Sequence, residues 1–399
     1  MSDKEEIISL AQKYLMSSYN RLPVVFEKGK GCRLWDTEGR EYLDFLSGLG
    51  VNSLGYGYPS VVRAIKEQAE KLLHTSNLFY IGLQAQLAEL VVQQAFSGKM
   101  FFCNSGAEAN EAAIKLARLY ARKVRGIEQG EIITAFRSFH GRTMATLTAT
   151  GQEKIQKGFE PLLPGFTYVP FNDVQAVRDA VTNSTIAVLV EPIQGEGGVQ
   201  VGTNEYLSSL REFCTQRGIL LILDEVQTGL GRTGRFFCHQ HAGIEPDVVS
   251  MAKALGGGVP IGAVLARDEV AQVFVPGSHA TTFGGNHLSC AAGVATVEAI
   301  VRHGILENCQ KMGEYLNEGL LALQQKYPFI KEVRGKGLLC GVELDTEGTR
   351  IARECLEEGL IINCTMSTVL RFLPPLIISR EEVDKGLFIL DKVLSRQQF

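Results

Sequence analysis

The sequence Leu220-Leu-Ile-Leu-Asp-Glu-Val-Gln-Thr-Gly-Leu-Gly-Arg-Thr-Gly234 joins an apolar run to two acidic residues and three glycines. Gly229, Gly231 and Gly234 have the G-x-G-x-x-G spacing of a dinucleotide-binding βαβ unit. In such a unit the first glycine follows the strand directly and the third opens a helix. Here residues 224–228 separate the apolar run from Gly229, and no helical apolar period follows Gly234. We therefore predict that the glycines are turn residues and that the acids ending the strand are more informative.

Composition and charge are typical of a soluble globular protein that works on small molecules. The 399 residues are 45% apolar and 21% charged, enough for two domains with large cores. A net charge of −4 gives no basic surface for nucleic acid, and no apolar run reaches the roughly 18 residues that span a bilayer. The acidic start of the chain argues against a signal or transit peptide, and nine cysteines without a C-x-x-C pair favour a reducing compartment. We predict a cytoplasmic protein without nucleic-acid, membrane or metal partners.

Short apolar runs alternate with amphipathic segments in the middle of the chain. Strands separated by helices predict an α/β fold with a mostly parallel sheet covered by helices on both faces. The segment 107–125 begins directly after a strand and predicts a helix with one apolar face. The predicted strands are Met100–Cys103, Ile132–Ala135, Thr185–Val190, Ile219–Leu223, Val248–Met251 and Ile261–Ala266.

Three parts of the chain differ in pattern. Residues 1–50 contain a turn-rich segment and predict an N-terminal arm and hairpin that pack with a small C-terminal domain. Residues 51–290 carry the alternating strands and helices of a large domain. Residues 291–399 predict the small α+β domain, with helical residues up to 326, a break at His303-Gly304 and short strands at 333–344, 360–363 and 369–373.

Polar residues end four of the predicted strands. Glu191, Asp224 and Lys253 each follow an apolar run, and Asn104-Ser-Gly-Ala107 follows Met100–Cys103. Ligands of open α/β sheets gather beyond the carboxyl ends of the strands. We therefore expect these residues to surround one site.

Three of these strand ends have the chemistry of a pyridoxal phosphate pocket. Apolar surroundings lower the pKa of Lys253 and favour the neutral amine that a Schiff base requires. The Asp224 carboxylate suits a protonated ring nitrogen, and Ser105-Gly106-Ala107 at a helix start suits a phosphate. Singly, a snorkelling lysine, a turn-forming aspartate and an ordinary helix cap explain these residues as well. Together, in this order along the chain, they predict the cofactor.

A series of longer motifs also indicates a pyridoxal phosphate site. The chain contains Phe101-Phe-Cys-Asn-Ser-Gly-Ala-Glu-Ala-Asn-Glu-Ala-Ala-Ile-Lys115, Ser138-Phe-His-Gly-Arg-Thr143, Glu191-Pro-Ile-Gln-Gly-Glu-Gly-Gly198, Asp224-Glu-Val-Gln-Thr-Gly229, Ala252-Lys-Ala-Leu-Gly-Gly-Gly258, Thr281-Thr-Phe-Gly-Gly-Asn286 and Arg371-Phe-Leu-Pro-Pro375. With this series it resembles the class III aminotransferases of fold type I over nearly its whole length. The resemblance implies transfer of the terminal amino group of N-acetylornithine to 2-oxoglutarate, giving N-acetylglutamate semialdehyde and glutamate, in arginine biosynthesis.

The resemblance also implies a role for each matched residue of the cofactor site. Lys253 holds pyridoxal phosphate covalently, and Asp224 pairs with the pyridine nitrogen. The other implied contacts are Ser105, Gly106 and Ala107 at the phosphate, Phe139 and Val226 on the two ring faces, Gln227 at the phenolic oxygen, and Thr282 at the phosphate of the neighbouring subunit in a homodimer.

Two arginines are implied to recognise two substrates of different length. Arg142 holds the α-carboxylate of the long donor, and Arg371 holds that of glutamate and pairs with Glu196 when the long donor is bound. A guanidinium binds a carboxylate through two hydrogen bonds, which suits this alternation. Tyr19 and Thr281 are implied to contact substrate. An ordinary ion pair, a solvated loop acid, a core tyrosine and a loop threonine remain alternatives for these positions.

Several residues depart from the pattern of the family. Tyr56 and Tyr58 stand where histidines are frequent, Ala280 replaces a glycine, and His287 replaces a proline. Leu49 stands where ornithine aminotransferases tend to have a tyrosine near the free α-amino group. An apolar residue there favours an acylated amine, because no buried hydroxyl needs a partner. N-succinyl-diaminopimelate, succinylornithine and ornithine remain alternative donors.

Other classes of protein are possible on weaker grounds. A nicotinamide dehydrogenase would use the glycines at 229–234, and a non-catalytic pyridoxal-binding sensor would need a DNA-binding module that the first 50 residues do not suggest. Within the fold, an aminomutase or a racemase would not need two carboxylate-binding arginines. His140, His239 and His241 are expected to be packed or surface histidines and not a catalytic base or metal ligands.

Overall fold

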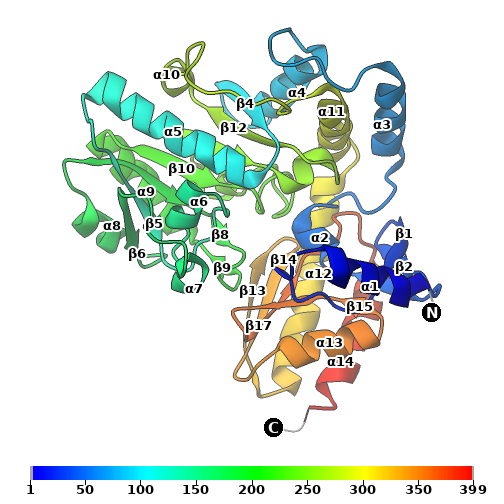
Figure 1. Cartoon of the computed structure of the whole chain (residues 1–399). Helices are drawn as coiled ribbons and strands as arrows, with labels where there is room; N and C mark the ends of the chain where they lie inside the picture. The colour runs from blue at the N-terminus through cyan, green and yellow to red at the C-terminus, as the bar shows by residue number, and fades with distance from the viewer. Residues whose placement is uncertain (1–2, 398–399) are drawn as a thin grey trace.

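A seven-stranded sheet forms the centre of the larger part of the molecule (Figure 1). The computed structural model describes residues 3–397. The strand order is β4-β12-β11-β10-β7-β5-β6, and β12 is the one strand of this sheet that runs antiparallel to its neighbours. The strands are β4 (Lys99–Cys103), β5 (Glu131–Ala135), β6 (Phe166–Val169), β7 (Thr185–Val190), β10 (Leu220–Asp224), β11 (Val248–Met251) and β12 (Gly262–Ala266).

The mostly parallel sheet and all six predicted strands are confirmed, and β6 is an addition. β6 has only four residues, lies at the sheet edge and is mostly half-buried. Its weak apolar signal explains why the sequence did not predict it. The prediction that Gly229, Gly231 and Gly234 are turn residues is also confirmed, because the chain runs through turns from β10 to residue 237.

Helices cover both faces of this sheet because its strands are apolar on both sides. In β7, Ala187 and Leu189 pack with α5, whereas Val188 and Val190 pack with α9 on the other face. Near β11 and β12, helix α11 packs against α3 and α4. The covering helices are α3 (Pro59–Lys71), α4 (Gly82–Val92), α5 (Gly106–Arg125), α6 (Met144–Ala149), α7 (Glu153–Gln156), α8 (Val174–Ala180), α9 (Asn204–Arg217), α10 (Asp268–Ala271) and α11 (His287–Arg302), with 3₁₀ turns η1 (Cys238–His241) and η2 (Lys253–Gly256).

A second, antiparallel sheet lies in the C-terminal part, in the order β13-β14-β17-β16. Its register places Arg334, Gly341, Arg371 and Asn363 in one row across the four strands. Helix α12 packs on β13 and against α14. The elements are α12 (Ile305–Lys326), β13 (Ile330–Lys336), β14 (Leu339–Leu344), α13 (Thr349–Glu357), β16 (Asn363–Thr365), β17 (Val369–Phe372) and α14 (Arg380–Leu394).

The N-terminal segment lies beside these C-terminal elements (Figure 1). Strand β15 (Leu360–Ile361) pairs in parallel with β3 (Glu41–Asp44), which continues the sheet of β1 (Phe26–Lys30) and β2 (Arg33–Asp36). Helix α1 (Asp3–Tyr14) precedes them, and α2 (Ser47–Gly50) follows. The division of the chain at residues 50 and 290 remains a prediction.

Over residues 3–397, no single helix is long and apolar enough to cross a bilayer, and only α11 and α12 together, bent by 67° at their junction, meet that condition.

Candidate active site

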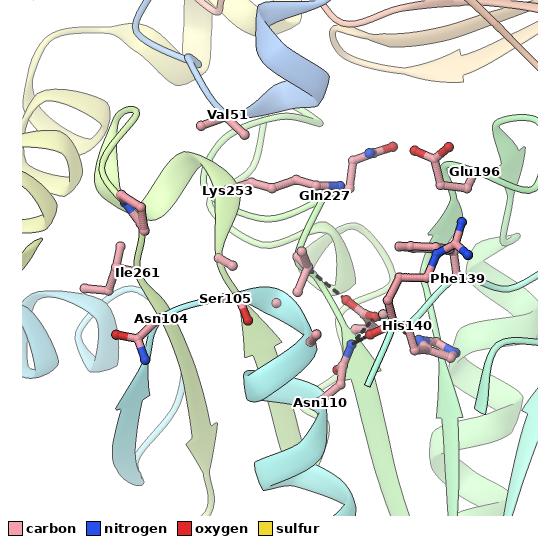
Figure 2. A pocket seen from close by; sticks show the side chains of 18 of the residues that line it. Val51, Asn104, Ser105, Asn110, Phe139, His140, Glu196, Gln227, Lys253 and Ile261 are labelled. Carbon is pink, nitrogen blue, oxygen red and sulfur yellow. Dashed lines mark hydrogen bonds and ion pairs between the residues drawn. The ribbon is translucent and has the colours of Figure 1, made fainter. Parts of the chain in front are cut away.

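Four strands of the central sheet have their carboxyl ends on the same side, where they border a cavity of about 450 Å³ (Figure 2). Residues at the ends of β4, β7, β10 and β11 gather there because these strands run in the same direction. The volume suits a small molecule. The lining residues include Val51, Asn104, Ser105, Gly106, Ala107, Asn110, Phe139, His140, Arg142, Glu191, Glu196, Asp224, Val226, Gln227, Lys253 and Ile261.

The start of helix α5 forms one wall of the cavity. The Ser105 hydroxyl caps the helix by accepting a hydrogen bond from the Glu108 amide. The first N–H groups of a helix have no partner inside it and favour an anion. Gly106 packs so closely on Val226 that an added Cβ would lie 2.7 Å from a Val226 methyl carbon. Glycine is therefore required for this close approach.

Asp224 is fixed on the floor of the cavity by three hydrogen bonds. Its Oδ2 accepts from the Asn110 side chain at 2.7 Å and from His140 Nδ1 at 2.8 Å, and its Oδ1 accepts from the Val226 amide at 3.0 Å. Ser250 donates to the Asn110 side chain, which fixes the orientation of that amide. Because all these groups are buried, the carboxylate has one orientation available to it.

Lys253 follows β11 and extends into the cavity (Figure 2). Its backbone has φ of +40°, a conformation that is rare for a residue with a side chain and is found at functional sites. Burial, together with the charge of Arg371, lowers the pKa of the Lys253 amine, although Glu196 and Asp224 oppose this shift. The neutral, nucleophilic amine is therefore available at a lower pH than in an exposed lysine.

Glu191, at the end of β7, is a further buried acid of the cavity. Its carboxylate accepts from the Phe139 and Gly195 amides at 3.0 and 3.3 Å. Burial and the neighbouring Asp224 carboxylate raise the pKa of Glu191. The protonated form of Glu191 is therefore favoured more than in an exposed glutamate.

Arg371 and Glu196 form an ion pair above the cavity. Arg371 Nη1 donates to Glu196 Oε1 at 2.6 Å, and it lies 3.4 Å from Gln227 Oε1. Arg371 is fully buried, and its Nη2 has no hydrogen-bond partner among residues 3–397. Burial opposes ionisation of Glu196, but the charge of Arg371 outweighs it and lowers the Glu196 pKa. Arg371 Nε also donates to the Asn363 side chain at 3.1 Å, so two guanidinium nitrogens are engaged and the buried Nη2 is unpaired.

The other arginine has a different environment. Arg142 is exposed, lines the cavity and lies with its guanidinium 5.7 Å from the centre of the Phe139 ring. No ion pair is present for it among the described residues. The site therefore offers one free and one neutralised guanidinium.

The remaining predicted contacts lie outside the cavity of the single chain. Thr281 is half-buried and lies 3.4 Å from the Asn104 side chain, whereas Thr282 is exposed. Tyr19 is 73% exposed, and its ring packs on Arg21. Leu49 is exposed on a left-handed turn, with Val51 of the same segment lining the cavity.

Sequence reasoning missed the residues that support Asp224. Asn110 lies one helical turn after Gly106, where an amide in an alanine-rich stretch was the only available signal. His140 is packed, as predicted, but it also contacts Asp224, and its other ring nitrogen lies 3.2 Å from the Thr134 hydroxyl. The contacts of Asn110 and His140 with Asp224 join residues 114 and 84 positions apart, and no local pattern indicates them.

Comparison with known proteins gives the family. The model of the aminotransferase class III family matches residues 14–394. The chain belongs to the class III aminotransferases.

Individual relatives agree with this membership. The acetylornithine aminotransferase of Caldanaerobacter subterraneus is 53% identical to this class III aminotransferase, over 98% of this chain and 100% of the relative. The solved acetylornithine aminotransferase of Elizabethkingia anophelis is 34% identical, covers 100% of both chains and has a TM-score of 0.90. The ornithine aminotransferase of Toxoplasma gondii, with partial occupancy of pyridoxal phosphate at its active site, is 35% identical, with a TM-score of 0.95 over 99% of this chain and 95% of the other.

Class III aminotransferases use pyridoxal phosphate, and the cavity of this one has the matching donor set. It combines a primary amine with a lowered pKa, a buried carboxylate on its floor and a helix start on its wall. Gly106 leaves no space for a Cβ beside Val226, so the helix start can approach the cavity closely. The residues present therefore fit the cofactor.

Proposed function

We propose that this aminotransferase moves the terminal amino group of N-acetylornithine to 2-oxoglutarate, giving N-acetylglutamate semialdehyde and glutamate in arginine biosynthesis. Relatives about half identical over nearly the whole chain carry the name acetylornithine aminotransferase. The observation that carries the proposal is the contrast between the free guanidinium of Arg142 and that of Arg371, which is paired with Glu196.

Two carboxylate substrates of different length need such a contrast. The α-carboxylate of the long donor lies far from its reacting amine and would bind Arg142 at the edge of the cavity, while Glu196 neutralises Arg371. The α-carboxylate of glutamate lies next to its amine and would displace Glu196 from Arg371. The unpaired Nη2 of Arg371 supports this exchange, because a substrate carboxylate could engage Nη1 and Nη2 together.

The cofactor contacts stay assigned as in the sequence prediction. Pyridoxal phosphate supplies, when bound, an aldehyde that condenses with amines and a ring that accepts electrons. Lys253 would hold the aldehyde carbon and Asp224 the ring nitrogen. The remaining contacts would be Ser105, Gly106 and Ala107 at the phosphate, Phe139 and Val226 on the ring faces, and Gln227 at the phenolic oxygen.

Proton transfer falls to Lys253. With the cofactor and the substrate amine bound, the Lys253 amine would be free to accept the proton from the amine-bearing carbon of the donor and to return it to the reacting group. Burial lowers the pKa of this amine, so its unprotonated form, which can accept a proton, is present at lower pH than in an exposed lysine. Asn110 and His140 hold the Asp224 carboxylate in place through their hydrogen bonds.

We also propose a cytoplasmic homodimer in which Thr282 binds the phosphate of the second copy. Leu78, Phe79, Tyr80 and Phe283 are each more than half exposed, although large apolar side chains are usually buried. Asn77 donates hydrogen bonds to the backbone at Thr281 and Gly284, so the two apolar segments lie together. A second copy would cover this surface and bring Thr282 to its site. The nine free cysteines agree with a reducing compartment.

The test offers separate donors to the purified, cofactor-loaded enzyme with 2-oxoglutarate. N-acetylornithine should have the highest kcat/KM, ahead of succinylornithine, N-succinyl-diaminopimelate and free ornithine. Borohydride reduction followed by peptide mapping should label Lys253, and Lys253→Ala should lose turnover. Equal turnover of free ornithine would refute the acylated donor, and an unlabelled Lys253 would refute the mechanism.

A further inference from the structure

The turn that carries Glu196 contains a strained residue. Residues 195–199 connect β8 (Ile193–Gln194) to β9 (Gln200–Val201). Val199 in this turn is fully buried and has φ of +52°. The left-handed conformation is a genuine outlier for a β-branched residue and is energetically unfavourable. Surrounding contacts must therefore impose the shape of this turn.

Arg334 of the C-terminal sheet supplies such contacts. Its Nε donates to the Gly198 and Val199 carbonyls at 3.0 and 3.1 Å, and its Nη2 donates to Gly198 at 2.6 Å. Its Nη1 pairs with Glu332 at 2.6 Å and also with Glu343. The Arg334 side chain is almost fully buried, and both acids lie on its own sheet. A planar guanidinium engaged on both edges fixes the carbonyls that it binds.

Val199 also packs onto the sheet at the position between the two arginines. Gly341 pairs with Arg334 on one side and with Arg371 on the other. A Cβ added at Gly341 would lie 2.8 Å from the Val199 Cβ, so the valine occupies the space that a side chain would need. The row Arg334, Gly341 and Arg371 thus forms the surface on which the 195–199 turn packs.

Glu196, at the other end of the turn, is held by Arg371 of this row and by Thr365 of the neighbouring strand β16. The Thr365 hydroxyl donates to the Glu196 carbonyl at 2.7 Å, while Arg371 binds the Glu196 carboxylate at 2.6 Å. The backbone is therefore fixed after Glu196 by Thr365 and Arg334, and before it by the Gly195 amide, which donates to Glu191 at 3.3 Å. Displacement of Glu196 from Arg371 then requires movement of its side chain alone.

We propose that Arg334 is a positioning residue that holds the 195–199 turn so that Glu196 covers Arg371, and thereby sets how readily a substrate carboxylate takes its place. The proposal rests on the exchange at Arg371 proposed above. If Arg334 is removed, the strained turn relaxes and Glu196 covers Arg371 less well. Short dicarboxylates then bind more tightly. The preference of the enzyme for the long donor falls, because Arg371 competes with Arg142 for the carboxylate of that donor.

The test compares Arg334→Gln and Arg334→Lys with Arg350→Gln, which removes an exposed arginine from the same part of the chain. The dissociation constant of glutarate, an unreactive five-carbon diacid, is measured by calorimetry on the holoenzyme. Each half-reaction is then followed in single turnovers with acetylornithine or glutamate. We expect Arg334→Gln to bind glutarate roughly fivefold to tenfold more tightly, and to lower the ratio of acetylornithine to glutamate kcat/KM by a similar factor. Arg350→Gln should change neither quantity.

Gly341→Ala displaces the turn from the other side and covers the case in which Arg334→Gln does not fold, as judged by circular dichroism and thermal unfolding. It should change glutarate affinity in the same direction. Combining Arg334→Gln with Glu196→Ala should add little to the effect of Glu196→Ala alone, because both act through one contact.

Two results would overturn the proposal, and they can be told apart. If Glu196→Ala shifts the ratio but folded Arg334 and Gly341 variants leave it unchanged, or slow both half-reactions equally, Arg334 is merely structural. If Glu196→Ala itself leaves the ratio unchanged, the exchange at Arg371 is wrong and the inference falls with it.

Discussion

Asp224 Oδ2 accepts hydrogen bonds from two side chains at once, and one of them is His140, whose Nδ1 lies 2.8 Å away. The ring is buried, and its Nε2 lies 3.2 Å from the Thr134 hydroxyl. His140 therefore holds the Asp224 carboxylate in place through one ring nitrogen while the other faces Thr134.

Loss of His140 should impair catalysis without loss of the fold. We expect His140→Ala to lower kcat roughly tenfold to a hundredfold, because a hydrogen bond to a buried charged group is lost. His303→Ala, which removes a histidine that contacts Tyr58, is the control and should leave kcat unchanged. Steady-state kinetics with acetylornithine measures the effect. An unchanged kcat for His140→Ala would show that Asn110 and the Val226 amide suffice.

Gly106→Ala should weaken the cofactor. The new Cβ would lie 2.7 Å from a Val226 methyl carbon, so either Val226 or the start of α5 must move. Overpacking of this size should raise the dissociation constant of pyridoxal phosphate about tenfold or more. Gly82→Ala is the matched control, because it also opens a helix but has open space around it. Equal cofactor affinity in both variants would contradict the close approach.

The pH dependence of cofactor capture should follow the charges around Lys253. Only the neutral amine attacks an aldehyde, so the capture rate of the apoenzyme rises with pH through the Lys253 pKa. Arg371 lowers this pKa and Glu196 raises it. Arg371→Gln should therefore move the midpoint to higher pH, and Glu196→Gln to lower pH. Stopped-flow absorbance at a series of pH values measures both, and shifts of the same sign would refute the electrostatic assignment.

Leu49→Tyr should improve the use of free ornithine. Leu49 lies on the left-handed turn before Val51, which lines the cavity. A hydroxyl on this turn can bind a free α-amino group, and we expect kcat/KM for ornithine to rise roughly tenfold relative to acetylornithine. Leu49→Phe has a similar ring without the hydroxyl and should lack the gain. If both variants gain equally, ring size and not hydrogen bonding decides the donor.

The strands and the residues that end them could be predicted because their signals are local. Apolar runs such as Thr185–Val190 are buried on both faces, and a polar residue directly after such a run lies at the carboxyl end of its strand. Ser105, Asp224 and Lys253 were therefore placed at one site from the chain order alone. Strand β6 was not predicted, because its four mostly half-buried residues at the sheet edge have too weak an apolar pattern.

The contacts between these residues could not be predicted in the same way. Glu196 and Arg371 are 175 positions apart, and Asn110 and Asp224 are 114 apart. The resemblance to a family supplied the first pair, but nothing in the sequence indicated the second.

The sequence by itself determined the buried strands of the central sheet and the chemistry of the residues that follow them, because apolar periodicity and side-chain type act over a few residues. Only the tertiary structure decided that Arg334, Gly341 and Arg371 form one row, that the strained turn at Val199 rests on it, and that Glu196 thereby covers Arg371. Strand register and the packing of one sheet on a distant turn depend on how all the elements fit together, and no short stretch of the chain encodes that fit.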